Sequence, residues 1–133
     1  MKLTRIDASH PLFEASFTLY EASFPPNERR MREDHLRALQ DADFSPLGAV
    51  EDGMLLADVF LWETEDFCYL EHFAVQPSLR GHGTGSTILR QLLTQDKPLI
   101  LEIEPPEEEI TFRRKHFYER NGLCAQPYGH VQL

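Results

Sequence analysis

The chain has 133 residues and a formal net charge of −9, with 41% hydrophobic and 26% charged residues. This length fits one domain with a single core, and this composition is typical of a globular protein rather than a disordered or membrane-spanning one. The negative charge disfavours nucleic acid as a partner and favours amine-bearing ones. No apolar run approaches the ~18 residues of a membrane span and the N-terminus lacks a secretory signal, so we expect a cytoplasmic protein.

The N-terminal region predicts a strand followed by two helices. Residues 2–7 alternate polar and apolar side chains as a strand does, and Ser9 ahead of Pro11 is a signal for the start of a helix. The proline pair at 25–26 must end that helix because proline lacks the amide hydrogen. A second helix is expected over about 28–40, with residues 28–30 on the surface. One stripe of this helix would hold Met31, His35 and Leu39.

Three strands are expected next. Asp52–Gly53 lies between two apolar runs, which is a strong signal for a β-hairpin. Residues 66–75 are rich in aromatic side chains and predict a third strand, which ends before Pro77. Cys68 and Cys124 have no cysteine or histidine neighbour at metal-ligand spacing, so we expect two buried side chains and no metal site.

The rest of the chain alternates helices and strands. Apolar residues between 88 and 93 mark one face of a helix, and residues 98–104 then alternate as a strand. A helix is expected over 107–121, ended by Gly122, with one further strand after it. This order of elements indicates one α/β domain over 1–133.

A glycine-rich loop, RGHGTG at 80–85, lies between a predicted strand and a predicted helix. Such a loop presents free amide hydrogens at a helix N-terminus and favours an anion such as phosphate. A nucleotide P-loop would need a lysine, and none occurs from 76 to 96. A dinucleotide fingerprint would need another final glycine spacing and an earlier strand. The loop therefore fits neither of these nucleotide sites.

The loop and two neighbouring segments resemble the GNAT acetyltransferases. Arg80 followed by Gly83 and Gly85 is similar to the Arg/Gln-x-x-Gly-x-Gly/Ala pyrophosphate loop of that family. The surrounding HFAVQPSLRGHGTGSTILRQLL resembles the family's strand-loop-helix core, and FYERNGL at 117–123 resembles its later helix end. The resemblance covers about 66–123. It implies the acyl-CoA N-acyltransferase fold, a mixed but mostly antiparallel sheet with splayed middle strands, flanked by helices.

The resemblance also implies a binding site for acetyl-CoA. In the family, the loop binds the pyrophosphate of this cosubstrate, and the pantetheine arm inserts between the splayed strands. The carried-over cofactor-binding residues are Arg80, Gly81, His82, Gly83, Thr84, Gly85 and Ser86, with backbone groups of Phe73 and Val75. Arg80 brings positive charge to an acidic chain. His82 is expected to face solvent rather than to act in catalysis.

The implied chemistry is attack of an amine on a thioester, for which a lysine-like ammonium must first lose a proton. Glu71, on the strand before the loop, and Glu102, at the position used by protein N-terminal acetyltransferases, compete as the base. Each fits equally well as a solvent-exposed or ion-paired strand carboxylate, and Glu104 is a weaker candidate. Tyr118 matches the tyrosine that in many members acts as general acid near the leaving thiolate.

The sequence departs from the family pattern near its C-terminus. Thr111 and Phe112 stand about where many members have an asparagine that contacts the cofactor arm. Residues 113–115 form a basic turn that fits a solvated helix face or contacts to phosphate. The C-terminal hairpin looks short or truncated, so another subunit could complete the acceptor wall in a homodimer.

We therefore expect an acetyl-CoA-dependent N-acetyltransferase that acts on a primary amine of a small molecule or peptide. Two alternatives remain open. The chain could be a non-catalytic acyl-CoA-binding or sensing domain that kept the loop, or an interaction module whose edge strands pair in a dimer. Acetyl-CoA and an amine acceptor would be the partners, with neither nucleic acid nor a membrane involved.

Overall fold

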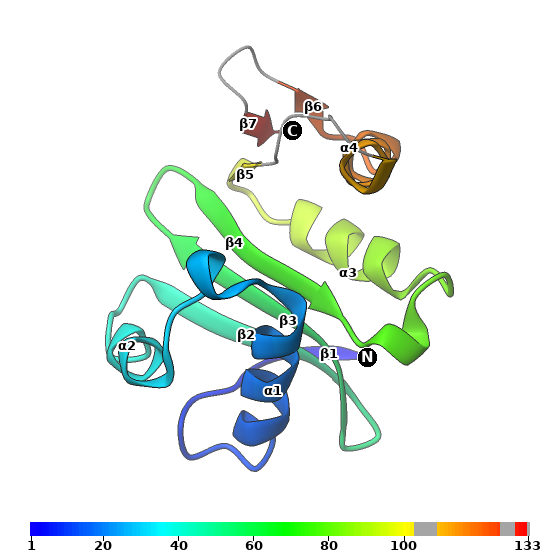
Figure 1. The fold of residues 1–133 in the computed structure, drawn as a ribbon. Helices are drawn as coiled ribbons and strands as arrows, with labels where there is room; N and C mark the ends of the chain where they lie inside the picture. Colours follow the sequence, from blue (N-terminus) through cyan, green and yellow to red (C-terminus); the bar gives the residue numbers. More distant parts are fainter. Residues whose placement is uncertain (103–108, 126–129, 133) are drawn as a thin grey trace.

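In residues 1–102, 109–125 and 130–132, which the computed structural model describes, seven strands form one mixed sheet with four α-helices against its faces (Figure 1). The strand order is β1-β2-β3-β4-β5-β7-β6, and β4 and β5 form the parallel pair. In chain order the elements are β1 (Lys2–Arg5), α1 (Phe13–Ser23), η1 (Pro26–Glu28), α2 (Arg32–Ala38), β2 (Phe44–Glu51), β3 (Met54–Glu63), β4 (Cys68–Val75), η2 (Pro77–Leu79), α3 (Thr84–Leu93), β5 (Leu99–Glu102), α4 (Glu109–Arg120), β6 (Cys124–Ala125) and β7 (His130–Gln132). This mixed sheet confirms the predicted fold class.

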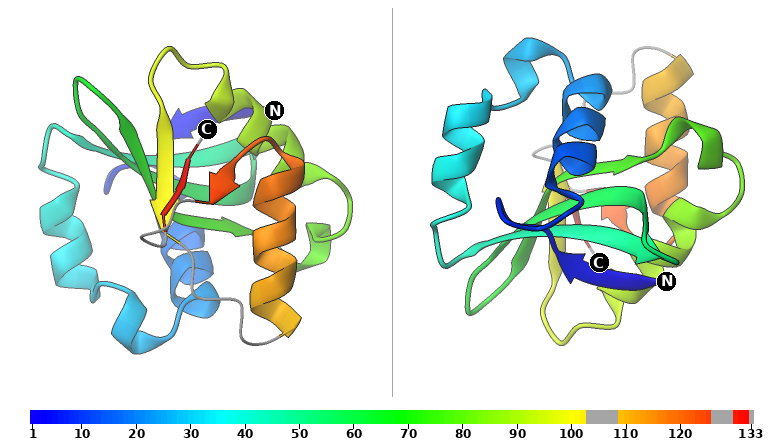
Figure 2. Two further views of the ribbon diagram at one scale, coloured as in Figure 1. Left: turned by 90° about the horizontal axis from the view of Figure 1, so that it is seen from above. Right: turned by 90° about the horizontal axis from the view of Figure 1, so that it is seen from below.

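The helices cover the two faces of the sheet in pairs. Figure 2 shows α1 and α2 on one face and α3 and α4 on the other. The main core lies between the sheet and α3, where Ile88, Leu89 and Leu92 pack against β3 and β4. On the other face Phe17 and Tyr20 of α1 pack against aromatic side chains of β2 and β3. The burial of Ile88, Leu89 and Leu92 confirms the predicted apolar face of α3.

The N-terminal helices differ from their predicted bounds. Helix α1 begins at Phe13 without a side-chain cap, and the Ser9 hydroxyl donates instead to Asp7, so the prediction that Ser9 starts the helix is wrong. Helix α2 covers seven residues, because η1 and an extended stretch through Met31 occupy the first residues of the predicted 28–40 helix. Met31 is therefore exposed rather than on the buried stripe, whereas His35 is buried as expected.

The predicted hairpin joins β2 and β3. Asp52 and Gly53 both have positive φ, 51° and 76°, as the tight turn between twisted strands requires. On the other side of β3, Leu61 pairs with Leu70 and Phe60 with His72, which leaves Glu71 as an extra residue of β4. This bulge bends the strand at Glu71.

Strands β4 and β5 are paired over a short distance. Their register contains Cys68 with Leu99 and Tyr69 with Ile100, while the other edge of β5 pairs with β7 from Ile100 to Glu102. Among the described residues, the rest of β4 has no partner strand on the side of β5, which confirms the expected splay of the middle strands.

Some predictions concern residues near the C-terminus. Two short strands, β6 and β7, pair there, where the sequence predicts one. Cys68 is buried as expected, and burial raises the pKa of its thiol to about 11. The side chain of Cys124 lies outside the described residues.

Over the described part of the chain, no helix is both long enough and apolar enough to cross a membrane.

Candidate active site

The open edge of β4 presents main-chain groups of two residues. The Gln76 amide donates to the Leu56 carbonyl at 2.9 Å, so that pair is a hydrogen-bonded pair of the β3–β4 ladder. Hydrogen-bonded and non-hydrogen-bonded pairs alternate in an antiparallel ladder, so Val75 and Phe73 are in non-hydrogen-bonded pairs with β3. Their N–H and C=O groups therefore point away from β3, into the gap where β4 and β5 separate.

The glycine loop follows directly at the end of β4. Gly81 and Gly83 have φ of 84° and 79°, a left-handed conformation that glycine adopts without a Cβ clash, and nothing lies within 4 Å of where a Cβ would be. The amides of Arg80 and His82 donate weakly to the Pro77 and Leu79 carbonyls, at 3.4 and 3.3 Å, and the two left-handed glycines turn the chain into α3. The first amides of α3 lack helical acceptors. The loop is thus open to solvent and suited to an anion.

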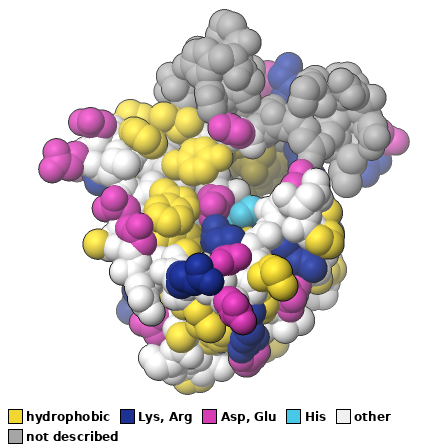
Figure 3. Space-filling model, turned by 60° about the vertical axis from the view of Figure 1, so that its left-hand side comes forward, with side chains coloured by type: hydrophobic (Ala, Val, Ile, Leu, Met, Phe, Trp, Pro, Cys, Tyr) yellow, Lys and Arg dark blue, Asp and Glu magenta, His cyan; other side chains and the backbone are white. Residues whose placement is uncertain are grey.

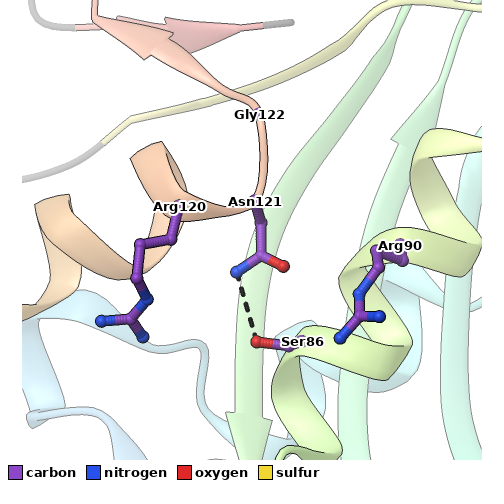
Figure 4. A pocket seen from close by; sticks show the side chains of 5 residues that line it. All are labelled: Ser86, Arg90, Arg120, Asn121 and Gly122. Atoms are coloured by element: carbon purple, nitrogen blue, oxygen red, sulfur yellow. Dashed lines mark hydrogen bonds between the residues drawn. The ribbon is translucent and has the colours of Figure 1, made fainter.

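Gly85 differs from Gly81 and Gly83, because neighbouring side chains occupy the space that its Cβ would need. A Cβ on Gly85 would lie 3.3 Å from the Phe117 ring of α4 and 3.6 Å from Val75 of β4. The missing side chain lets α4 approach the first turn of α3. Beside this contact, an open pocket of about 500 Å³ is lined by Ser86, Arg90, Arg120, Asn121 and Gly122 (Figure 4).

Glu71, at the bulge of β4, is held by an arginine from the segment between η1 and α2. The Arg30 guanidinium donates to Glu71 Oε1 at 2.5 Å, and both side chains are about four-fifths buried. The same guanidinium lies 5.0 Å from the ring centre of Phe44, and the Arg30 amide donates to the Tyr20 hydroxyl at 2.6 Å. The expectation that residues 28–30 lie on the surface is therefore wrong for Arg30.

Two histidines, the buried His35 and the largely buried His72, lie beside this ion pair. The Arg30 guanidinium lies 3.3 Å from His35 Nδ1, which must be unprotonated to accept a hydrogen bond. Burial, and then the charge of Arg30, lowers the pKa of His35 to about 4. Burial also lowers the pKa of His72 to about 4, although Glu71, 3.7 Å away, opposes this shift. Both imidazoles are thus neutral at pH 7, and the Arg30–Glu71 pair carries the local charges.

The face of β3, β4 and β5 opposite the main core extends from Glu71 toward the outer end of the sheet. Leu61, Leu70 and Leu101 point into the main core. Side chains alternate between the two faces of a strand, so the neighbours of these leucines lie on the opposite face. These neighbours are Trp62, Tyr69, Glu71, Ile100 and Glu102. Figure 3 shows hydrophobic side chains on this side beside a group of acidic, basic and histidine side chains.

Tyr69 lies between the two candidate bases on this face. Burial raises the pKa of Tyr69, and the negative charges of Glu102 and Glu71 raise it further. Both carboxylates are therefore close enough to act on one phenol. Glu102 is exposed at the end of β5 and interacts with a neighbour, whereas Glu71 is largely buried and fixed.

Tyr118, in the last turns of α4, packs on the main core from the other side of the sheet. Its ring lies 5.2 Å from that of Phe117, and burial raises the pKa of its phenol to about 12. A phenol with this pKa keeps its proton at neutral pH and is available as a hydrogen-bond donor.

The structure brings most of the predicted residues to the two sides of the β4–β5 gap. The loop, the main chain of Phe73 and Val75, and Tyr118 lie toward α3 and α4, while Glu71 and Glu102 lie on the other face. Glu104 and the side chains of Thr111 and Phe112 lie outside the described residues. Sequence reasoning missed Arg30 as a partner of Glu71, since no local signal links residues that are 41 positions apart.

Comparisons with known proteins agree with this architecture. Residues 45–122 match the family model of the GNAT acetyltransferase domain. A solved structure from Bacteroides thetaiotaomicron, assigned to the GNAT acetyltransferases, is 30% identical, has a TM-score of 0.89, and covers 96% of this chain and 74% of that one. A GNAT acetyltransferase from Elizabethkingia anophelis, solved with acetyl-CoA bound, has a TM-score of 0.70 at 13% identity, over 94% of this chain and 76% of that one.

One curated relative matches part of the chain. YjbC of Bacillus subtilis (strain 168), which carries the name of an acetyltransferase, is 33% identical over 71 residues, or 51% of this chain. The match spans 37% of the length of YjbC.

Proposed function

The chain belongs to the GNAT acetyltransferase family, and on that premise we propose that it transfers the acetyl group of acetyl-CoA to a primary amine. The observation that carries this proposal is the gap between β4 and β5, with the glycine loop at one end of it. Main-chain groups that β3 does not use line one edge of the gap, and the open glycine loop with the first amides of α3 follows. Together they suit a long ligand with a phosphorylated end and an extended amide-bearing arm.

In the proposed cosubstrate site, both main-chain groups and side chains bind acetyl-CoA. The amides from Gly81 to Ser86 would hold the pyrophosphate, and Arg80 would add charge to an otherwise acidic chain. The main-chain groups of Phe73 and Val75 would bind the amides of the pantetheine arm as a neighbouring strand would. The thioester would then lie deep in the gap, between the faces that carry Glu71 and Tyr118.

The proposed reaction is a direct transfer. The acceptor's ammonium loses a proton to a glutamate, directly or through water, and the amine nitrogen then attacks the thioester carbonyl carbon. The C–S bond breaks as the tetrahedral intermediate collapses, and the thiolate takes a proton from the Tyr118 hydroxyl. The attacking nitrogen gives up its second proton, which returns to the Tyr118 oxygen through water and leaves the neutral amide. The products are an acetamide and free coenzyme A. The raised pKa of Tyr118, about 12, keeps the phenol protonated at neutral pH, so its hydroxyl can donate a hydrogen bond to the sulfur as the C–S bond breaks.

We propose Glu71 as the base in preference to Glu102. The bulge turns Glu71 out of the regular ladder, and Arg30 fixes its Oε1, which orients the carboxylate for a bound amine. The exposed Glu102 at the end of β5 would add negative charge that attracts the cationic acceptor. Glu71→Gln should lower kcat strongly, whereas Glu102→Gln should raise the KM for the acceptor. The opposite pattern would assign the base to Glu102.

The proposed acceptor is a cationic amine with an apolar part. Trp62 and Tyr69 are partly exposed beside the carboxylates, and aromatic faces bind ammonium groups. The test is a thiol-release assay with acetyl-CoA and a panel of polyamines, amino acids, aminoglycosides and peptide N-termini. Release with at least one amine is expected. Thermal stabilisation by coenzyme A without release from any acceptor would favour a sensing domain instead.

A further inference from the structure

The pocket between α3 and α4 has the side chains of an anion site. Ser86 and Arg90 are four residues apart on α3 and so share one helix face, while Arg120, Asn121 and Gly122 come from the end of α4. Figure 4 shows the two arginine side chains on either side of the hydrogen bond between Asn121 and Ser86. The pocket therefore has Arg90 and Arg120, which are 30 positions apart in the sequence, in one lining.

The two arginines of this pocket are without partners in the described part of the chain. Arg30, Arg32 and Arg113 form ion pairs with glutamates, but neither Arg90 nor Arg120 forms an ion pair or a side-chain hydrogen bond with a described residue. Both are exposed. Two unpaired guanidinium groups that repel each other across one pocket favour a ligand with more than one negative charge.

The polar groups between the arginines also favour an anion. Asn121 Nδ2 donates to the Phe117 carbonyl at 2.8 Å and to Ser86 Oγ at 3.3 Å. The Ser86 hydroxyl accepts this bond, so its own hydrogen remains available for a ligand. A hydroxyl donor between two guanidinium groups suits the oxygens of a phosphate monoester.

The distance between the pocket and the glycine loop indicates which phosphate of the ligand the pocket would bind. Ser86 directly follows the loop, and Arg90 lies about one helical turn farther, about 6 Å along α3. Coenzyme A carries its pyrophosphate on the 5′ oxygen and a phosphate monoester on the 3′ oxygen of the same ribose. With the pyrophosphate in the loop, one sugar ring separates it from the second phosphate. That spacing is of the order of one helical turn.

We infer that Arg90 and Arg120, with the Ser86 hydroxyl, bind the 3′-phosphate of the cosubstrate; this inference rests on the proposed function. The loop would hold the pyrophosphate through main-chain amides, whereas this pocket would recognise the monoester through side chains. The arginines then determine specificity, because they distinguish coenzyme A from its 3′-dephospho form. Neither residue takes part in acetyl transfer.

The test compares coenzyme A with 3′-dephospho-coenzyme A by isothermal titration calorimetry on the full chain. The unaltered protein should bind coenzyme A at least about tenfold more tightly, as two partly exposed charge-assisted contacts would give. The double variant Arg90→Gln/Arg120→Gln should reduce this ratio to near one and leave the affinity for the dephospho form unchanged. Arg37→Gln, on α2 at the opposite face, is the matched control and should keep the full ratio.

The outcomes separate the inference from the proposed function. Equal affinity of the unaltered protein for both ligands would overturn the inference and leave the acetyl-CoA proposal intact. A preference for coenzyme A that survives in the double variant would also overturn it, and would point to the basic turn at 113–115. Binding of neither ligand would overturn both proposals. A melting temperature for each variant confirms that the altered chain is folded.

Discussion

Asp58→Asn should remove a pH dependence of stability that a buried carboxyl imposes on the protein. Asp58 lies on β3 with no exposed surface, facing α1, where the Ser16 hydroxyl donates to its Oδ1 at 2.7 Å. Its Oδ2 is buried and has no partner among the described residues. Burial raises the pKa of Asp58 from its ordinary 3.8 to about 8, and the Ser16 bond opposes this shift. The folded chain therefore carries a neutral acid here at pH 7.

The sign and size of the effect follow from proton linkage. Between about pH 4 and pH 8 the folded state holds a proton that the unfolded state releases, so the free energy of unfolding falls as the pH rises. The limiting slope is about 1.4 kcal/mol per pH unit, which gives at most about 3 kcal/mol between pH 5 and pH 7. Asparagine has nearly the same shape and can accept the Ser16 bond, but it does not titrate.

The assay is equilibrium unfolding in urea at pH 5, 6, 7 and 8. The histidines His35 and His72, whose pKa values are also shifted, are common to both proteins, so their contribution cancels in the difference between the variant and the unaltered chain. The stability of Asp58→Asn relative to the unaltered chain should therefore rise steadily from pH 5 to pH 8. Asp96→Asn, at an exposed loop position, is the control and should show no such trend. Parallel stability curves for Asp58→Asn and the unaltered chain would refute the reasoning.

Three further substitutions test the proposed site. Arg30→Gln should lower kcat, because Glu71 then loses the partner that fixes its Oε1 and orients the carboxylate; an unchanged kcat would argue against this positioning role of Arg30. Tyr118→Phe should lower kcat with little change in the Kd for coenzyme A, and unchanged turnover would remove this residue from the mechanism. Gly83→Ala should raise the KM for acetyl-CoA and cost about 1 kcal/mol of stability, because the alanine would be strained at φ 79°; an unaltered KM and melting temperature would contradict this.

Local signals in the sequence were sufficient for the elements whose conformation depends on neighbouring residues. The Asp52–Gly53 turn, the loop before α3 and the helix end at Gly122 each depend on backbone angles that glycine permits, and all three have positive φ in the structure. The apolar face of α3 was equally clear because its spacing matches the helical repeat.

The features that depend on distant residues could not be predicted in this way. The bulge at Glu71 depends on how β3 and β4 are paired, and the sequence pattern within 66–75 does not indicate where that pairing shifts. Arg30 is buried because Phe44, Tyr20 and Glu71 meet around it from three other elements. A charged residue after two prolines otherwise resembles any surface turn.

The short register between β4 and β5 also divides the sheet mechanically. In the described structure, β1 to β4 form one antiparallel unit and β5 to β7 another, and two residue pairs join them along the sheet. Such units tend to open separately, as cooperative segments of different local stability. A ligand in the gap would hydrogen-bond the free edge as an added strand does, and so tie the two units together. Amide hydrogen exchange would then slow across β5 and α4 together when the gap is filled.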